Sequence, residues 1–298
     1  MALWSKFVSD MTQKKFVTDL YSEIEDDNVF NGAAALAYYW MLAIFPLTIF
    51  LLSLLPFLPI PNLKDAIMDL LGQALPREAA TLFTDVVSEV TSNTSGGLLS
   101  FGLLFTLWSA SSGLYAIMQQ LNITYDVKEG RSFWRVRGVA LLLTVMFLVM
   151  IVGAFALVVF GGVVQDWLAS FMGQSPLLLG FFAALRWIII IGLILMGFAM
   201  IYYFGPDVEQ KFQFITPGSI IGSALLIAAS VGFSFYVSNF SDYTATYGSI
   251  GAVIILLLWL YLAGLVILLG SEVNALLEHY NPAGKNKGEK TEPEPELG

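Results

Sequence analysis

The chain has 298 residues, of which 57% are hydrophobic and only 12% are charged, and its mean hydropathy is +0.75. A soluble domain carries roughly a quarter charged residues, so the composition excludes a soluble globular protein and indicates a membrane protein with several spans. The net charge of −9 argues against nucleic acid as a general partner, because phosphate binding needs a basic surface. The absence of cysteine from the sequence excludes disulfides, thiolate catalysis, thiolate zinc sites and iron–sulfur clusters.

The first patterned segment, residues 13–27, predicts a helix that lies on the cytoplasmic membrane surface. Phe16, Leu20 and Ile24 recur at a spacing of four, with charged residues between them, which is typical of an interfacial amphipathic helix. The first apolar run begins only near Ala33, after several acidic residues. We therefore expect no cleavable signal peptide.

Six stretches reach the roughly 20 apolar residues that a spanning helix needs. They lie at about 33–58, 97–118, 138–164, 179–204, 217–238 and 249–271. If the N-terminus is inside, most of the 14 basic residues fall on the cytoplasmic side, so the charge bias predicts that both termini are cytoplasmic. Pro46 lies inside the first span and predicts a kink there, because proline lacks a backbone donor.

Two further segments lie outside the predicted spans. Residues 62–94 carry apolar residues in two helical stripes separated by Gly72 and Pro76, which predicts an amphipathic helical hairpin on the extracytoplasmic side. Residues 281–298 are rich in Gly, Pro, Lys and Glu, which predicts a disordered acidic cytoplasmic tail. Residues 1–280 would then form a single all-α membrane domain, a polytopic bundle of six transmembrane helices.

Polar residues follow one face of the second span. Ser112, Tyr115, Gln119 and Asn122 are separated by three, four and three residues, and serines form a similar stripe in the fifth span. These stripes either line two walls of one cavity or let helices pack closely in lipid. Amide side chains in a membrane need partners, so Gln119 and Asn122 are the stronger candidates for a functional role.

The few charges near the spans each allow two interpretations. Arg186 lies 20 residues before Pro206, about 30 Å along a helix, so it either snorkels at the outer interface or faces an outward cavity. Glu272, at the inner end of the sixth span, is either a titrating carboxylate or a hydrated helix-end group. Small residues at two span starts indicate close helix contacts or a moving helix pair, and these are Gly218, Gly222, Gly248 and Gly251.

Enzyme chemistry finds no support in the sequence. A hydrolase needs a histidine base or a pair of carboxylates in a cavity, and no inward carboxylate pair is evident within the predicted spans. The sequence contains no zinc motif and no phosphate-binding glycine loop. We therefore expect no catalytic site, no metal and no cofactor.

Several motifs together resemble one known family. They are Ala33–Tyr39 followed by Phe45-Pro46-Leu47, Trp108–Tyr125 with Arg131, Tyr202-Tyr203, Pro206, Pro217-Gly218, Tyr247–Ala252, Trp259-Leu260-Tyr261 and Gly270–Ala275. Over about residues 15–280 the chain resembles the YihY/BrkB family of bacterial inner-membrane proteins. The resemblance implies six spans with cytoplasmic termini. It supplies no settled catalytic residues.

The resemblance also bears on function. The family has been labelled ribonuclease BN, but an acidic chain without a metal-nuclease constellation is a poor ribonuclease. Members have been linked to serum resistance and to export of envelope lipids. The sequence therefore predicts a transporter-like protein of the bacterial inner membrane that moves a lipid or other amphipathic envelope substrate. The residues expected to line its path are Tyr38, Tyr39, Tyr115, Gln119, Asn122, Arg186 and Glu272.

The alternative is a non-transporting scaffold for envelope assembly. In either case we expect membrane lipids as partners, among them anionic headgroups, together with a second copy of the chain or an envelope protein. No nucleic acid is expected to bind.

Overall fold

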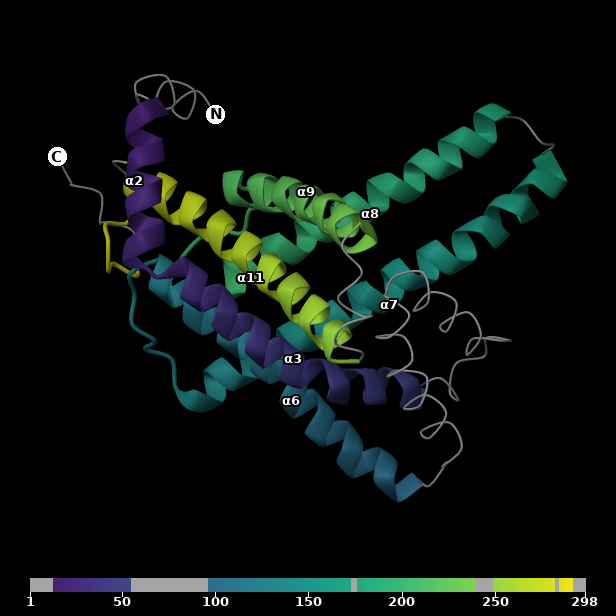
Figure 1. The fold of residues 1–298 in the computed structure, drawn as a ribbon, viewed down its shortest axis with the longest axis horizontal. Helices are drawn as coiled ribbons and strands as arrows, with labels where there is room; N and C mark the ends of the chain where they lie inside the picture. The colour runs from purple at the N-terminus through teal and green to yellow at the C-terminus, as the bar shows by residue number, and fades with distance from the viewer. Residues whose placement is uncertain (1–12, 55–95, 173–175, 240–248, 282–283, 292–298) are drawn as a thin grey trace.

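A computed structural model describes residues 13–54, 96–172, 176–239, 249–281 and 284–291 (Figure 1). This part of the chain is helical and contains no strand, which confirms the all-α prediction. The helices are α2 (Gln13–Asp26), α3 (Val29–Leu54), α6 (Gly96–Thr124), α7 (Phe133–Met172), α8 (Pro176–Phe204), α9 (Pro217–Asn239) and α11 (Ser249–His279). The predicted outer hairpin at 62–94 and Gly248 lie outside the described residues.

Four helices of the described part are long and apolar enough to cross a membrane. The segments are Phe133–Ala154 in α7, Gly180–Phe204 in α8, Pro217–Ser238 in α9 and Ile250–His279 in α11. At 1.5 Å per residue even the 22-residue segments reach about 33 Å, the thickness of a hydrocarbon core. They correspond to the third to sixth predicted spans. α3 and α6 coincide with the first and second, and α3 contains the shorter apolar segment Val29–Ile44.

The centre of the bundle is built by α3, α6 and α11, which pack on one another. Val29, Ala33 and Leu36 of α3 are buried against Leu121 of α6 and Leu268 of α11. From α6 onward each helix packs on the next, and α9 returns to contact α11. Apolar side chains at helical spacing thus bury one stripe of each helix.

Helix α3 has a proline in its interior, Pro46, as the sequence indicates. Proline cannot donate the backbone hydrogen bond to the preceding turn. In Figure 1 the helix changes direction along its second half, beyond the part that packs beside α11. This change of direction agrees with the predicted kink.

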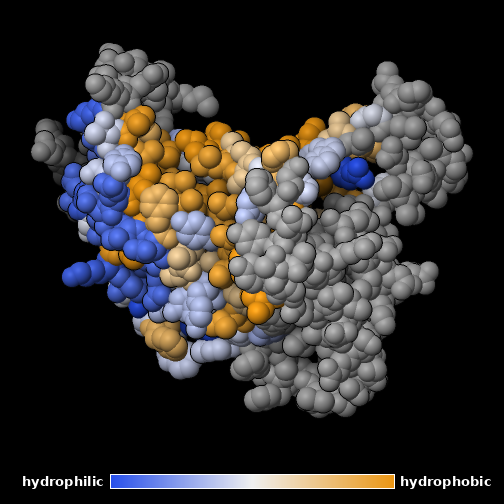
Figure 2. Space-filling view, in the orientation of Figure 1, coloured by the Kyte–Doolittle hydropathy of each residue, from blue (hydrophilic) through white to orange (hydrophobic). Residues whose placement is uncertain are grey.

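Polar and charged residues gather at one end of the bundle. Figure 2 shows them on the left, over the end where α2 lies in Figure 1, whereas apolar side chains cover the middle. We call this region the charged end; it comprises α2, residues 125–132 and 205–216, the last turns of α11 and residues 284–291. Asn28 and Asp126 adopt positive φ angles of 52° and 54°, which lets the chain turn sharply after α2 and α6.

Residues 284–291 lie against the charged end, although the sequence predicts disorder from residue 281 onward. Lys285 is 2% exposed and donates to the carbonyl oxygen of Glu209 at 2.7 Å. Lys287 pairs with Glu23 of α2 at 2.5 Å, and Lys290 forms an ion pair with Asp207. Ion pairs between the lysines of this low-complexity segment and carboxylates of the helices and loops thus hold the segment on the bundle.

The contact between α9 and α11 depends on glycine. A Cβ atom at Gly218 would lie 2.0 Å from the carbonyl oxygen of Gly270, so α9 and α11 could not approach so closely with a larger residue there. Gly222 serves the contact of α9 with α8 instead, since a Cβ atom there would lie 2.8 Å from Cε1 of Phe198. Gly251 is also buried, within the first turn of α11.

We expect Gly218→Ala to destabilise the protein by about 1–3 kcal/mol, because the added methyl group must push α9 away from α11. The matched control is Gly232→Ala in the same helix, where a Cβ atom meets nothing within 4 Å. The thermal unfolding midpoint in detergent measures both. Equal midpoints for the two variants would contradict the close contact.

Candidate functional site: a polar cavity at the charged end

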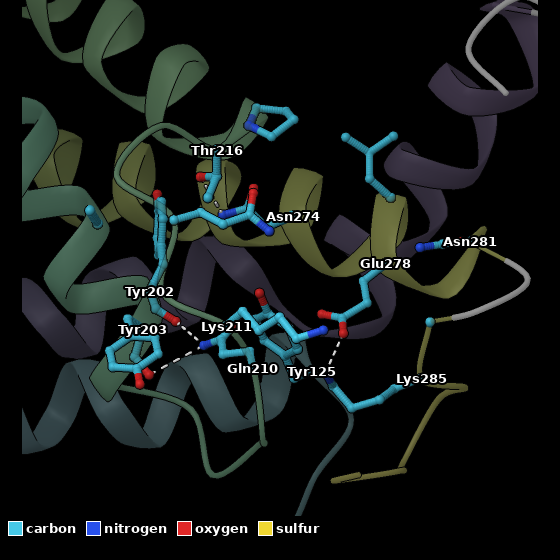
Figure 3. A pocket seen from close by; sticks show the side chains of 15 residues that line it. Tyr125, Tyr202, Tyr203, Gln210, Lys211, Thr216, Asn274, Glu278, Asn281 and Lys285 are labelled. Carbon is cyan, nitrogen blue, oxygen red and sulfur yellow. Dashed lines mark hydrogen bonds and ion pairs between the residues drawn. The ribbon is translucent and has the colours of Figure 1, made fainter. Parts of the chain in front are cut away.

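A cavity of about 270 Å³ opens at the charged end. It lies between the end of α8, residues 210–216, the start of α9, the last turns of α11 and residues 284–285 (Figure 3). Its polar lining comprises Tyr125, Tyr202, Tyr203, Gln210, Lys211, Gln213, Thr216, Asn274, Glu278, Asn281 and Lys285. The cavity is therefore able to hold a polar group next to membrane-spanning helices.

The start of α9 forms one wall, and its backbone donors are already paired. Thr216 caps the helix, since its Oγ1 accepts from the backbone N–H of Ser219 at 3.0 Å, and Pro217 follows at the first helical position. Asn274 of α11 accepts from the backbone N–H of Gly218 at 2.8 Å and donates to Thr216 Oγ1 at 3.1 Å. One amide side chain thus joins the start of α9 to α11.

The opposite wall is the end of α8. Gln210 donates from its side-chain nitrogen to the carbonyl oxygens of Tyr202 at 2.5 Å and Tyr203 at 3.3 Å (Figure 3). These carbonyls belong to the last turn of the helix, where no backbone N–H follows to bond them. The Tyr202 hydroxyl donates to the carbonyl oxygen of Ile267 at 2.9 Å and ties α8 to α11.

The charges of the cavity do not balance. Lys285 forms an ion pair with Glu278, so these two charges compensate each other (Figure 3). Lys211 is exposed at the cavity and forms no ion pair within the described part of the chain. The remaining positive charge favours an anionic group over a cationic one.

A network of polar contacts supports the cavity from the loop before α7. Asn122 donates to Glu129 at 2.9 Å and accepts from the backbone N–H of Asp207 at 2.7 Å. Arg131 donates to both carboxylate oxygens of Glu129, at 2.8 and 2.7 Å, and to the carbonyl oxygen of Gly205 at 2.9 Å. The network thereby fixes residues 204–207, which connect the cavity residues Tyr202 and Tyr203 to the cavity residue Gln210.

Two carboxylates of this network are stabilised in the ionised form. Burial opposes ionisation of Glu129, but hydrogen bonds from Arg131 and Asn122 outweigh it and hold the pKa of Glu129 below its ordinary value. Burial likewise opposes ionisation of Asp207, and the contacts of Lys290 and the Gly130 N–H lower its pKa below the ordinary value. Both groups therefore stabilise the folded state when they are ionised.

The seven predicted path residues are all described, and none of them lines the polar cavity. Tyr38 and Tyr39 are exposed on α3, with ring centroids 5.6 Å apart. Tyr115 accepts at 3.0 Å from Gln119, which is itself exposed. That the seven line one path stays a prediction.

The other three path residues are more buried. Asn122 is 4% exposed and belongs to the supporting network. Arg186 lies against α7, since a Cβ atom at Gly161 would lie 3.2 Å from its Cδ. Glu272 is 1% exposed in α11, so the alternative of a hydrated helix-end group does not describe it.

Sequence reasoning missed the residues that build the cavity. Gln210, Lys211 and Lys285 lie in loops or in the segment expected to be disordered, and no periodicity marks them. Asn274 and Thr216 carried a signal, because Asn274 lies in the Gly270–Ala275 motif and Thr216 precedes Pro217-Gly218. Their contact depends on the pairing of α9 with α11, which the sequence does not specify.

A second hollow, about 290 Å³ and almost wholly apolar, lies farther along the same helices. We call it the apolar cleft. It is lined by α7, α8, α9 and α11, through Phe147, Met150, Ile151, Ala154, Ile190, Leu193, Ile194, Gly197, Phe198, Ile201, Leu226, Ala263 and Ile267. On α11 the cleft residues end at Ile267 and the cavity residues begin at Asn274. The close contact of Gly218, Gly270 and Tyr202 lies at the level between them.

The helical fold, the apolar spans and the charged end define a multi-span helical membrane protein. The chain belongs to the BrkB family, since the family model described as Virulence factor BrkB matches residues 20–295. The resemblance seen in the sequence is thereby confirmed.

Known relatives agree with this membership. The chain is 39% identical over 262 residues to a putative ribonuclease-like protein, YfkH, of Bacillus subtilis, covering 88% of this chain and 94% of the relative. It is 27% identical over 283 residues to a UPF0761 membrane protein of Xanthomonas campestris, and 27% identical over 280 residues to one of Xanthomonas axonopodis. These matches cover 92% and 91% of this chain but only 63% of each Xanthomonas relative. No solved structure matches the chain.

The supporting network should make the protein sensitive to acid. The pKa values of Glu129 and Asp207 lie below their ordinary values of 4.5 and 3.8, so the stabilisation is complete above about pH 5 and is lost as the pH falls through the lowered values. We expect the thermal unfolding midpoint of the wild type to fall as the pH is lowered below about 5. The double variant Glu129→Gln, Asp207→Asn should drop less steeply.

The control is Asp26→Asn, which removes an exposed carboxylate of α2. It should keep the wild-type acid slope. An unchanged slope in the double variant would show that these two carboxylates do not carry the effect.

Proposed function

We propose that this protein is a transporter-like protein of the bacterial inner membrane that moves a lipid or another amphipathic envelope substrate. The observation that carries the proposal is the succession of a polar cavity and an apolar cleft along α8 and α11. An amphipathic molecule needs both surroundings, one for its headgroup and one for its chains. The proposal includes no enzymatic step.

The orientation proposed for the bundle places the charged end in the cytoplasm. Lysine and arginine are retained on the cytoplasmic side of membrane proteins, and Lys285, Lys287 and Lys290 lie at this end with Arg131. The polar cavity then opens to the cytoplasm, and both termini are cytoplasmic.

The chemistry of the cavity selects a headgroup class. Lys211 supplies a positive charge without an ion-pair partner among the described residues, and Gln213 and Tyr203 add hydrogen-bonding groups. A phosphate-bearing headgroup fits this lining better than a cationic one. Anionic lipids of the membrane are therefore the proposed partners.

Movement of a headgroup from the polar cavity to the apolar cleft requires the helices to separate at the contact that lies between the two. At that level the Tyr202 hydroxyl is bonded to α11 and Gly218 touches Gly270. Opening at this level also breaks the hydrogen bonds of Asn274 that join α9 to α11, so binding of the substrate must offset their loss. No nucleotide-binding motif is present in the sequence, so the proposed drive is an ion gradient, a partner or the substrate gradient.

The test is lipid movement in vesicles. Purified protein is reconstituted with fluorescent phosphatidylglycerol, and the fraction of probe that crosses the bilayer is followed by reduction of the exposed dye. We expect Lys211→Glu to lower the rate about tenfold, equivalent to ~1.4 kcal/mol of lost headgroup attraction, whereas Lys211→Arg keeps it.

The matched control is Lys128→Glu, an equal charge reversal at an exposed lysine that does not line the cavity. Wild-type vesicles no faster than empty ones would overturn transport of this lipid class and favour the scaffold. Equal rates for the wild type and Lys211→Glu would remove Lys211 from the path. RNA incubated with the same protein should stay intact.

A further inference from the structure

Two acidic side chains meet inside the charged end. Asp27 lies in the turn between α2 and α3, and Glu272 lies in α11, and their carboxyl groups are in hydrogen-bonding contact. Glu272 is 1% exposed. With both groups ionised, Oδ2 of Asp27 and Oε1 of Glu272 are buried without a donor among the described residues.

The contact has a chemical consequence. An ionised carboxylate can only accept hydrogen bonds, so two of them cannot bond each other. A hydrogen bond between two carboxyl groups requires that one of them carries a proton. Two negative charges in contact also repel each other strongly where water is excluded, which disfavours the doubly ionised pair.

The surroundings strengthen this requirement, because negative groups outnumber positive ones. Glu23 of α2 and Asp126 after α6 both act on the pair, and Lys287 is the cation that offsets them. Lys287 itself lies 2.5 Å from Glu23 and 3.8 Å from Asp126. Burial raises the pKa of Asp27 to about 6, although the contact with Glu272 acts in the opposite direction.

Other titratable groups near the pair come from the end of α6 and from α11. Burial and the negative charges of Glu278 and Glu272 raise the pKa of Tyr125. His279 interacts electrostatically with Asp126, Glu23, Glu278 and Lys287. Glu278 is already paired with Lys285. These groups surround the pair, but none donates a hydrogen bond to its orphaned oxygens.

The pair lies where α2, α3 and α11 pack together. Glu272 follows Ser271, whose hydroxyl lies 2.6 Å from the Thr124 hydroxyl in a buried contact between α6 and α11. Asp27 connects this point to the turn that positions α2. α11 also lines the polar cavity through Asn274 and Glu278, two and six residues farther along.

We propose that Asp27 and Glu272 form a binding site for one proton, and that the shared proton holds the α2–α3 turn on α11. The proton is taken from water at the charged end and returned to it, with one O–H bond formed or broken and no other change. When the proton leaves, two carboxylates face each other, and the turn separates from α11. This site exists whether or not the protein moves lipids.

Stability against pH tests the site with the full chain in detergent. The native pair holds a proton that carboxyls of the unfolded chain lose near their ordinary values of 3.8 and 4.5. The contribution of the pair to stability is therefore greatest below those values, and it is lost as the pH rises toward the titration of the pair. Above about pH 5 the unfolding constant should rise tenfold per pH unit relative to that of Glu272→Gln.

Glu272→Gln removes the need for a proton, because its amide donates permanently to Asp27. Infrared spectra give a second readout: the wild type should show the carbonyl band of a protonated carboxylic acid at neutral pH. Glu272→Gln should lack it, and Glu278→Gln, which loses a carboxylate paired with Lys285, should keep it. If Glu272→Gln does not fold, Asp27→Asn replaces it in both measurements.

Two results would overturn the proton site. One is an equal pH slope in the wild type and the amide variant, with no carboxylic-acid band. The other is a wild type stabilised by Na⁺ or Ca²⁺ at constant ionic strength while Glu272→Gln is not, because a bound cation would then take the place of the proton. Failure of lipid movement in vesicles leaves both readouts unaffected.

Discussion

The charged end depends on one physical constraint, that polar groups buried beside apolar helices must be bonded within the protein. Three amide side chains meet it, because an amide both donates and accepts. Asn122 joins Glu129 to the backbone of Asp207, Asn274 joins α11 to the first turn of α9, and Gln210 bonds the last carbonyls of α8. Each amide also fixes a helix terminus, so the shape of the cavity follows from these pairings.

The carboxylates of this end behave in two opposite ways. Glu129 and Asp207 face Arg131 and Lys290, so their ionised forms are stabilised. Asp27 is different, because burial raises its pKa and so favours its protonated form. One set loses stabilisation in acid and the other in base, and together they place the most stable range of the protein between the two limits. The arrangement of charges, and not the net charge of the chain, determines this range.

Sequence patterns predicted the helices well because membrane spans depend on local composition. The helix expected at 13–27 is observed as α2, Gln13–Asp26, and the last four predicted spans coincide with α7, α8, α9 and α11. The site was less predictable, since its contacts join residues far apart in the chain. Asp27 precedes the first apolar run and Glu272 ends the last one, so a search within spans could not pair them. The lysines after residue 283 resembled a solvated tail because their carboxylate partners lie on other elements.

The docked segment 284–291 carries a further consequence for experiments on topology. In the proposed orientation its lysines hold this end on the cytoplasmic side, and the same lysines neutralise Glu23, Asp207 and Glu278. Biogenesis and folding thus draw on the same few ammonium groups. A topology reporter in which these lysines are replaced by acidic residues would alter both processes at once. A change in its signal could then come from an inverted orientation or from a loosened bundle. Reporters that leave residues 284–291 intact keep the two effects apart.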